Sequence, residues 1–164
     1  MRIAVASDHA GLPLKDHIVP VLRSLGHDVT DVGTRTPDPV DYPDYAVAGC
    51  REVIAGRAER AILFCGSGVG MSIVANKLPG IRAGNVEDHY SAHQGVEHDD
   101  MNVLVLGGRT IGAAVAEELA RAFVSARYTG EPRHARRLAK LLEIERHPDR
   151  FAAPAPAAAA AATA

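Results

Sequence analysis

The chain of 164 residues carries 18 Lys and Arg against 20 Asp and Glu, and 47% of its residues are hydrophobic. That length favours one domain with a packed core, and the formal net charge of -2 excludes a generally basic nucleic-acid binder. The aromatic content of 4%, with no Trp, argues against stacking platforms for single-stranded nucleic acid, and two Cys are too few for a disulfide scaffold.

No segment has the pattern of a secretory leader or a membrane span. The first apolar run ends at Asp8, too early for a signal peptide, and no apolar stretch reaches the ~18–20 residues of a membrane helix. With so few Cys, this pattern predicts a soluble cytoplasmic protein that has neither a membrane nor a nucleic-acid partner.

In the first half of the chain, short apolar runs alternate with longer segments of helical periodicity. The expected order is a buried strand at 3–6, a helix at 11–25 that Gly26 ends, a half-exposed edge strand at 27–32, a Pro- and Asp-rich loop at 34–43, a helix at 45–55 and a central strand at 61–65.

The second half continues the alternation and ends in a tail of biased composition. It is predicted to contain a glycine loop at 66–70, a short helix at 71–77, a strand at 81–86, a helix at 88–96, a strand at 103–106 and amphipathic helices at 110–126 and 133–145. Residues 151–164 are nearly all Ala and Pro and cannot form a core, so we interpret them as an appendage to a single domain of residues 1–150.

This alternation predicts an α/β protein with a three-layer α/β/α, Rossmann-like fold and a five-stranded parallel sheet. Sheets of this type bind ligands at the carboxyl ends of their strands, where the strand order switches. The candidate segments for a site are therefore residues 7–9, 65–70 and 107–110.

The glycine loop after the central strand is the first chemical signal. Its sequence is Gly66-Ser67-Gly68-Val69-Gly70. Its N–H groups and the start of the next helix could form a nest for an anion, although glycine turns are often simple tight connections. No Lys-Ser or Lys-Thr follows it, so it is not a Walker loop, and its spacing fits a dinucleotide site poorly.

Cys65 directly precedes this loop and allows two interpretations. A lone Cys is most often a buried small hydrophobe, which is also how we interpret Cys50. Facing a helix N-terminus at the end of a strand, however, Cys65 would exist partly as a thiolate at neutral pH. A base beside converging N–H groups suits proton abstraction alpha to a carbonyl, with an enediolate intermediate.

Charged side chains elsewhere give weaker signals. Asp8 and His9 follow the first strand, where helix capping and ligand binding fit the sequence equally well. Arg133 and Arg137 lie one helical turn apart and could clamp a phosphate, but a solvated basic helix explains them more simply. Arg109, after the last strand, is a further candidate for binding a phosphate.

The histidines between positions 89 and 98 raise the question of a metal site. His89 and His93 share a helical face, but no zinc-type motif accompanies them, so we favour surface positions for both. His98, in the acidic turn that follows, is the one we select as an acid–base group.

Six stretches together resemble the type B ribose-5-phosphate isomerase family, which also includes galactose-6-phosphate and allose-6-phosphate isomerases. They are IAVASDHAG at 3–11, DYPD at 41–44, CGSGVGMSI at 65–73, ANK at 75–77, GIRA at 80–83 and NVLVLGGR at 102–109. The resemblance extends to about Arg146 and is far more specific than the glycine loop alone.

The resemblance implies the interconversion of an aldose phosphate and a ketose phosphate, ribose 5-phosphate and ribulose 5-phosphate first, without a cofactor or a metal. Cys65 would move the proton between C1 and C2 through a cis-enediolate, and His98 would open the furanose ring. The backbone of residues 66–70, with the Ser67 hydroxyl, would hold the intermediate.

The resemblance also implies how the substrate is held and how the protein assembles. Family members are homodimers, sometimes dimers of dimers, and the region of His98 and Arg109 would come from the neighbouring subunit. The implied sugar contacts are Asp8, His9 and Tyr42, and the implied phosphate ligands are Arg109, Arg133 and Arg137.

Two positions distinguish this chain within the family pattern. Met71 stands where another branch places a glutamate base, which supports Cys65 as the base here. Asp99 stands where the family commonly has Asn, and an ionised Asp can only accept hydrogen bonds, so the usual sugar contact and the choice of sugar are in question.

Three alternatives stay open at the level of sequence. The sugar could be an allose, galactose or erythrulose phosphate. The protein could be a non-catalytic module that binds a sugar phosphate or a nucleotide, in which Cys65 and His98 need no role. It could, with less support, be a metalloenzyme that uses His89 and His93.

Overall fold

The computed structural model describes residues 1–152, so most of the predicted Ala- and Pro-rich tail lies outside the described residues. All the strand pairs are parallel, and their order across the sheet is β2-β1-β3-β5-β4. The strands are β1 (Arg2–Ser7), β2 (Asp28–Asp31), β3 (Arg60–Cys65), β4 (Ala83–Asn85) and β5 (Val103–Gly107). The expectations of a central strand β3 and a half-exposed edge strand β2 are confirmed.

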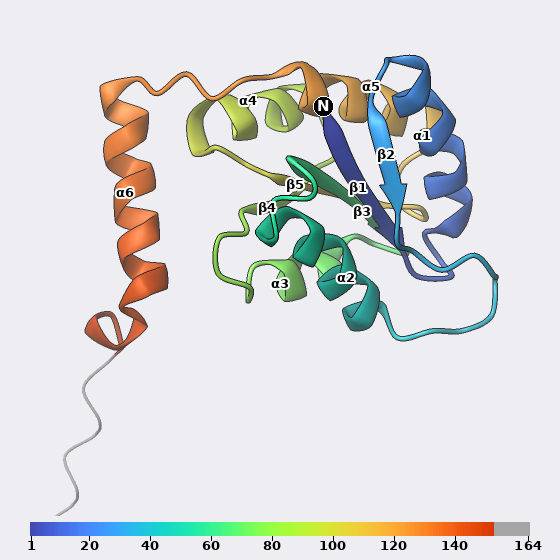
Figure 1. Ribbon diagram of the computed structural model, residues 1–164, viewed down its shortest axis with the longest axis horizontal. Coiled ribbons are helices and arrows are strands. Elements are labelled where there is room, and N and C mark those ends of the chain that lie inside the picture. The colour runs from blue at the N-terminus through green and yellow to red at the C-terminus, as the bar shows by residue number, and fades with distance from the viewer. Residues whose placement is uncertain (153–164) are drawn as a thin grey trace, which may run out of the picture.

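Helices cover both faces of this sheet (Figure 1). They are α1 (Leu12–Ser24), α2 (Tyr42–Ile54), α3 (Val69–Ala75), α4 (His89–Asp99), α5 (Ala113–Ser125) and α6 (Pro132–Arg146), followed by a 3₁₀ turn (Pro148–Arg150). Among residues 1–152, none of these helices combines the length and the apolar character that a membrane crossing requires.

The alternation of side chains along the strands divides the core into two layers. On β1, Ile3 and Val5 pack with α1, α4 and α5, whereas Ala4 and Ala6 face α2 and α3. The small residues let α2 approach the sheet so closely that a Cβ added to its Gly49 would lie 2.6 Å from Leu63 Cδ2. This arrangement confirms the three-layer α/β/α fold with five parallel strands.

The helices that border the glycine loop and His98 differ from the expected ranges. Helix α3 already begins at Val69, so Val69 and Gly70 belong to its first turn. Helix α4 continues to Asp99, which places His98 on its last turn rather than in an acidic turn. Asp88 caps the start of α4 by accepting from the Ser91 N–H at 2.8 Å, and Asp100 ends the helix with a left-handed φ of 52°.

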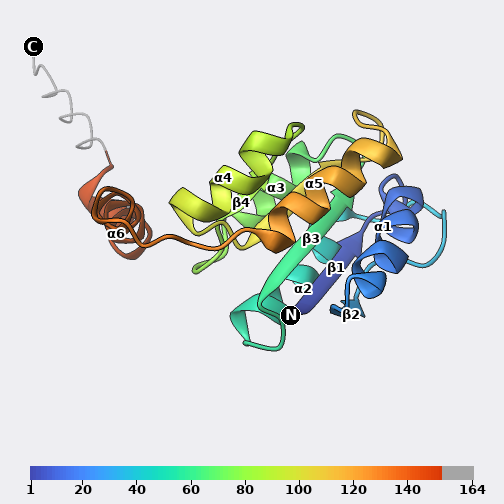
Figure 2. The same cartoon turned by 90° about the horizontal axis from the view of Figure 1, so that it is seen from above.

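Helix α6 stands apart from the rest of the molecule in both views (Figures 1 and 2). It contacts the end of α4, and the Glu145 carboxylate accepts a hydrogen bond from the Gly80 N–H at 2.9 Å. Its apolar Leu141 and Ile144 are nevertheless 42% and 49% exposed. An amphipathic helix normally buries its apolar face, so the apolar face of α6 is left partly uncovered by residues 1–152.

Candidate active site

The strand order switches direction between β1 and β3. The chain leaves β1 through α1 toward β2 on one side, whereas β3, β5 and β4 lie on the other. The segments after β1 and β3 meet there, and the Asp8 N–H donates to the Phe64 carbonyl at 3.2 Å. A cleft of about 370 Å³ opens at this point, lined by Asp8, His9, Ala10, Tyr42, Cys65, Gly66, Ser67, Gly70, Arg109 and Thr110.

Asp8 joins the start of α1 to the end of β3. Its Oδ1 accepts from the N–H groups of Ala10 and Gly11, at 2.9 and 2.8 Å. Gly11 lies so close to β3 that an added Cβ would be 2.3 Å from the Phe64 carbonyl carbon. Asp8 therefore holds the turn that precedes α1, and its capping interpretation is wrong, because the N-cap residue of α1 is Gly11 and no side chain caps the helix. Asp8 also lines the cleft, where Oδ2 has no hydrogen bond to any of residues 1–152.

Cys65 sits at the base of the cleft with 5% of its surface exposed. Its Sγ accepts a hydrogen bond from the Gly68 N–H at 3.0 Å. The Ser67 side chain is exposed beside it and accepts weakly from the Val69 N–H at 3.4 Å. Cys50 contrasts with Cys65, because it is fully buried and burial raises the pKa of its thiol to about 12.

His9 and Tyr42 also line the cleft. The Val40 N–H donates to His9 Nδ1 at 3.2 Å. Tyr42, on the first turn of α2, covers Gly70 so closely that an added Cβ would lie 2.8 Å from its ring. Both residues therefore lie at the same cleft as Cys65.

Arg109 reaches this cleft within a single chain. The Gly108 and Arg109 N–H groups donate to the carbonyls of Cys65 and Gly66, at 2.8 and 2.9 Å. The expectation that Arg109 would come from a neighbouring subunit is therefore wrong. Since β5 is the parallel neighbour of β3, the loops that follow the two strands are bound to each other.

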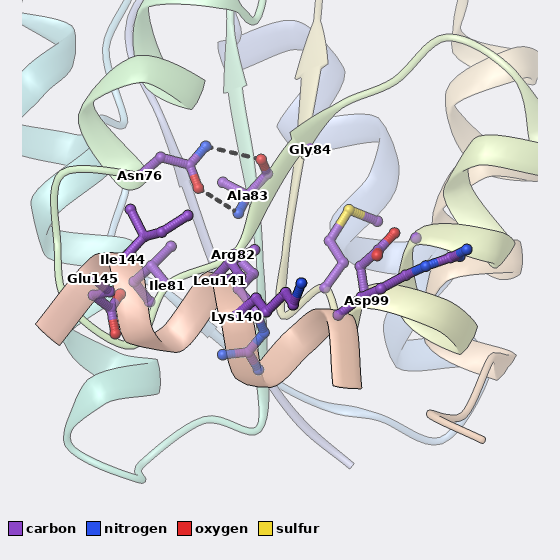
Figure 3. A pocket seen from close by; sticks show the side chains of 13 residues that line it. Asn76, Ile81, Arg82, Ala83, Gly84, Asp99, Lys140, Leu141, Ile144 and Glu145 are labelled. Atoms are coloured by element: carbon purple, nitrogen blue, oxygen red, sulfur yellow. Dashed lines mark hydrogen bonds between the residues drawn. The ribbon is translucent and has the colours of Figure 1, made fainter. Parts of the chain in front are cut away.

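The remaining predicted residues gather elsewhere, at the end of α4 and along α6. A groove of about 790 Å³ lies between α6 and the body of the molecule. Figure 3 shows its lining side chains, Asp99 and Lys140 among them. Arg137 lines the same groove, and Arg133 is exposed next to Glu131, with Nε 3.0 Å from its carboxylate. The groove is larger than the cleft, but no cysteine, serine or histidine of residues 1–152 lines it.

His98 belongs to this second group, and its contacts with two neighbours, Gln94 and His134, had not been predicted from the sequence. Its Nδ1 lies 2.7 Å from Gln94 Nε2, and its ring packs on that of His134 with 3.8 Å between the centroids. The pKa of His134 is lowered, because burial disfavours the imidazolium and His98 and Arg133 add positive charge. The i, i+4 spacing of Gln94 and His98 could have suggested the first contact. The second depends on the packing of α6 on α4.

The alternative of a metal site at His89 and His93 receives no support. Within residues 1–152 there is no group of three or more His, Cys, Asp or Glu side chains arranged to hold a metal ion. His93 Nδ1 instead lies 3.3 Å from Glu97 Oε2 on the same helix.

Known proteins similar to this chain include several isomerases. Ribose-5-phosphate isomerase B of Escherichia coli is 41% identical over 144 residues, which cover 88% of this chain and 96% of that protein. D-erythrulose-4-phosphate isomerase of Pectobacterium atrosepticum is 38% identical over 131 residues, covering 79% of this chain and 86% of that protein.

Two solved structures have the same fold. Ribose-5-phosphate isomerase B of Clostridium thermocellum superposes with a TM-score of 0.87 at 39% identity, covering 93% of this chain and 100% of that chain. The enzyme of Mycoplasma genitalium with bound ribulose-5-phosphate superposes with a TM-score of 0.83 at 35% identity, covering 88% and 96%. The family model described as Ribose/Galactose Isomerase matches residues 3–141, and the chain therefore belongs to that family.

Proposed function

We propose that this protein interconverts an aldose phosphate and a ketose phosphate, with ribose 5-phosphate and ribulose 5-phosphate as the leading pair. The observation that carries the proposal is the placement of the Cys65 sulfur at the base of a cleft, beside the N–H groups of the glycine loop. The relatives named for ribose 5-phosphate, one of them solved with ribulose-5-phosphate bound, support the choice of sugar.

Cys65 is the proposed base. In this proposal the Cys65 sulfur, which accepts a hydrogen bond from the Gly68 N–H, acts as a thiolate and removes the C2 proton of the open-chain aldose. The electron pair released forms the C1–C2 double bond of an enediolate and places negative charge on O1. The thiol then returns its proton to C1 while the proton on O2 moves to O1, which leaves a ketone at C2 and restores the thiolate.

The donors near the sulfur would hold the enediolate oxygens. N–H groups of residues 66–70 and the Ser67 hydroxyl lie at the same end of β3 as the base. Fixed donors at a developing oxyanion contribute about 3–4 kcal/mol each to the lowering of a barrier. Asp8, Tyr42 and Arg109, which line the cleft, would contact the sugar and its phosphate.

A second copy of the chain would complete this site. Ring opening by His98 and phosphate binding by Arg133 and Arg137 require side chains that lie outside the Cys65 cleft of their own chain. The exposed apolar residues of α6 provide a face that a second copy could cover. We infer a homodimer in which α6 and the end of α4 of one subunit close the cleft of the other.

Replacing Cys65 tests the chemistry directly. We expect Cys65→Ala to reduce kcat for ribose 5-phosphate by at least ~10²-fold, the usual contribution of a positioned general base, while calorimetry still detects substrate binding. Cys50→Ala is the matched control and should keep the wild-type kcat, because Cys50 lies in the core. Wild-type turnover in Cys65→Ala would exclude the sulfur as the base.

A four-carbon sugar phosphate is the second candidate substrate. The relative from Pectobacterium atrosepticum, which is named for D-erythrulose 4-phosphate, favours it. Specificity is a ratio of kcat/KM values, so ribose, allose, galactose and erythrulose phosphates must be compared under one set of conditions. Binding of ribose 5-phosphate without turnover of any of the four would favour the non-catalytic module instead.

A further inference from the structure

Lys15 is a buried cation that the proposed chemistry does not use. Its side chain is 1% exposed on α1, and Nζ lies 2.8 Å from Asp31 Oδ2 and donates to the Thr34 carbonyl at 2.7 Å. A buried ammonium is unfavourable by several kcal/mol unless it is paired and hydrogen-bonded, and here both conditions hold. Its two partners lie on either side of the point where the chain leaves β2.

The segment that Lys15 holds lies against the end of β1. The Thr34 N–H donates to the Ser7 carbonyl at 3.0 Å, and the Val32 N–H donates to the Val5 carbonyl at 2.9 Å. Between them, Gly33 is so close that an added Cβ would lie 2.5 Å from the Ser7 nitrogen. Ser7 immediately precedes Asp8 and His9, so this segment borders the cleft.

The same loop then reaches His9. The Val40 N–H donates to His9 Nδ1 at 3.2 Å, which requires a lone pair on that nitrogen. The proton of the neutral ring is therefore on Nε2, which has no hydrogen bond to any of residues 1–152. Since His9 lines the Cys65 cleft, this free N–H is available to a ligand.

We propose that Lys15 is a positioning residue for the cleft. By anchoring the start of the 32–41 loop, it keeps the Val40 N–H on His9 Nδ1, so that His9 presents a fixed Nε2–H donor to an oxygen of the substrate and does not act as a base. Which substrate oxygen accepts this hydrogen bond depends on the proposed isomerase function, whereas the tautomer of His9 does not depend on it.

The tautomer can be measured in the resting protein. Long-range proton–nitrogen correlation spectra of protein labelled with ¹⁵N-histidine distinguish the two neutral forms, and the spectrum of His9→Gln assigns the signals. At pH 7.5 we expect His9 to be in the Nε2–H form in the wild type and in a mixture of the two forms in Lys15→Met. An Nδ1–H tautomer in the wild type, or an unchanged His9 in Lys15→Met, would overturn the proposal even if the protein proved to have no isomerase activity.

Arg60→Met is the matched control for Lys15→Met. Arg60 is also a partly buried cation on backbone carbonyls, those of Phe123 and Ala126, but it starts β3 and so lies roughly 16 Å along the strand from Cys65. We expect Arg60→Met to lower the free energy of unfolding without changing the His9 signals or the KM for ribose 5-phosphate. Lys15→Met, in contrast, should raise that KM at least threefold. Equal effects of both variants on His9 would show a general loss of structure and refute a positioning role.

Two substitutions of His9 test which nitrogen acts. The amide of Gln can place an N–H near the position of Nε2, and the shorter amide of Asn places one near Nδ1. His9→Gln should therefore retain at least tenfold more kcat/KM than His9→Asn. The reverse order would contradict an Nε2–H donor.

Discussion

Gly68 determines the geometry of the proposed base. Its N–H donates to Cys65 Sγ, and its φ of 81° lies in the left-handed region that favours glycine. A Cβ added to it would lie 2.0 Å from Asn85 Oδ1, so the space is filled by a side chain that also donates to the Ser67 carbonyl at 3.3 Å. A single glycine therefore meets a conformational, a steric and a chemical requirement.

Gly68→Ala should show these three effects together. We expect the left-handed backbone alone to lower the free energy of unfolding by ~1–2 kcal/mol, and the contact with Asn85 to lower it further. Because the N–H on the sulfur moves as well, kcat should fall at least tenfold. Urea denaturation and steady-state assays measure the two effects.

Gly56→Ala is the matched control for that substitution. Gly56 also has a left-handed φ, of 68°, but nothing lies within 4 Å of its added Cβ. Gly56→Ala should lower the free energy of unfolding only by the ~1–2 kcal/mol that the left-handed backbone causes, and it should keep the wild-type kcat. If both variants retained full activity, the Gly68 N–H would have no part in catalysis.

At the scale of elements, the sequence predicts the strands better than the ends of the helices. The run at 61–65 is apolar throughout because both faces of β3 are covered, and a short run of this kind is typical of a buried parallel strand. The start of α3 at Val69 could not be placed, because Gly68 and Gly70 both suggest a loop and only one of them is left-handed. The detachment of α6 was also invisible, since its periodicity reports an apolar face and not what covers it.

The contact between α4 and α6 should weaken in acid. Burial and the positive charge of His98, Arg133 and Arg137 lower the pKa of His134 below its ordinary 6.5, and only Glu131 opposes them. Below pH 6.5 the His134 ring therefore binds more protons in the unfolded chain than in the folded chain. The stability that the neutral His134 ring contributes is present at neutral pH and is lost as the pH falls. Urea denaturation at fixed protein concentration should show a smaller loss between pH 7.5 and 5.5 in His134→Gln than in the wild type.

A substitution at the exposed end of α6 is the control for that measurement. His147→Gln removes an exposed imidazole from the residue after the helix and should keep the wild-type pH dependence. If His134→Gln and His147→Gln lost the same stability on acidification, the stacked rings would not be the cause.

At the scale of the whole molecule, the sequence identifies candidate residues but not which chain supplies them. Asp8, His9, Cys65 and Arg109 could be placed together because they follow neighbouring parallel strands. His98 and the α6 arginines could be named as candidates from the sequence, but not joined to this cleft, since strand periodicity says nothing of a surface that a second molecule covers. The resemblance assigned Arg109 to the neighbouring subunit, whereas the order of the parallel strands places it at the Cys65 cleft of its own chain.

Mixed dimers test the shared site that we propose. Cys65→Ala removes the base and the double variant Arg133→Ala, Arg137→Ala removes the phosphate ligands, so each homodimer should be inactive. If the two groups come from different subunits, a mixed dimer has one doubly defective site and one intact site, and random mixing restores about a quarter of wild-type activity. If both groups served the cleft of their own chain, every site would carry a defect and mixing would restore nothing. Each variant alone and the mixture of the two are denatured and refolded at equal total protein, and the isomerase activity of each sample is then measured. Because mixed dimers can form only in the mixture, activity above that of the separate variants shows that the two groups come from different subunits.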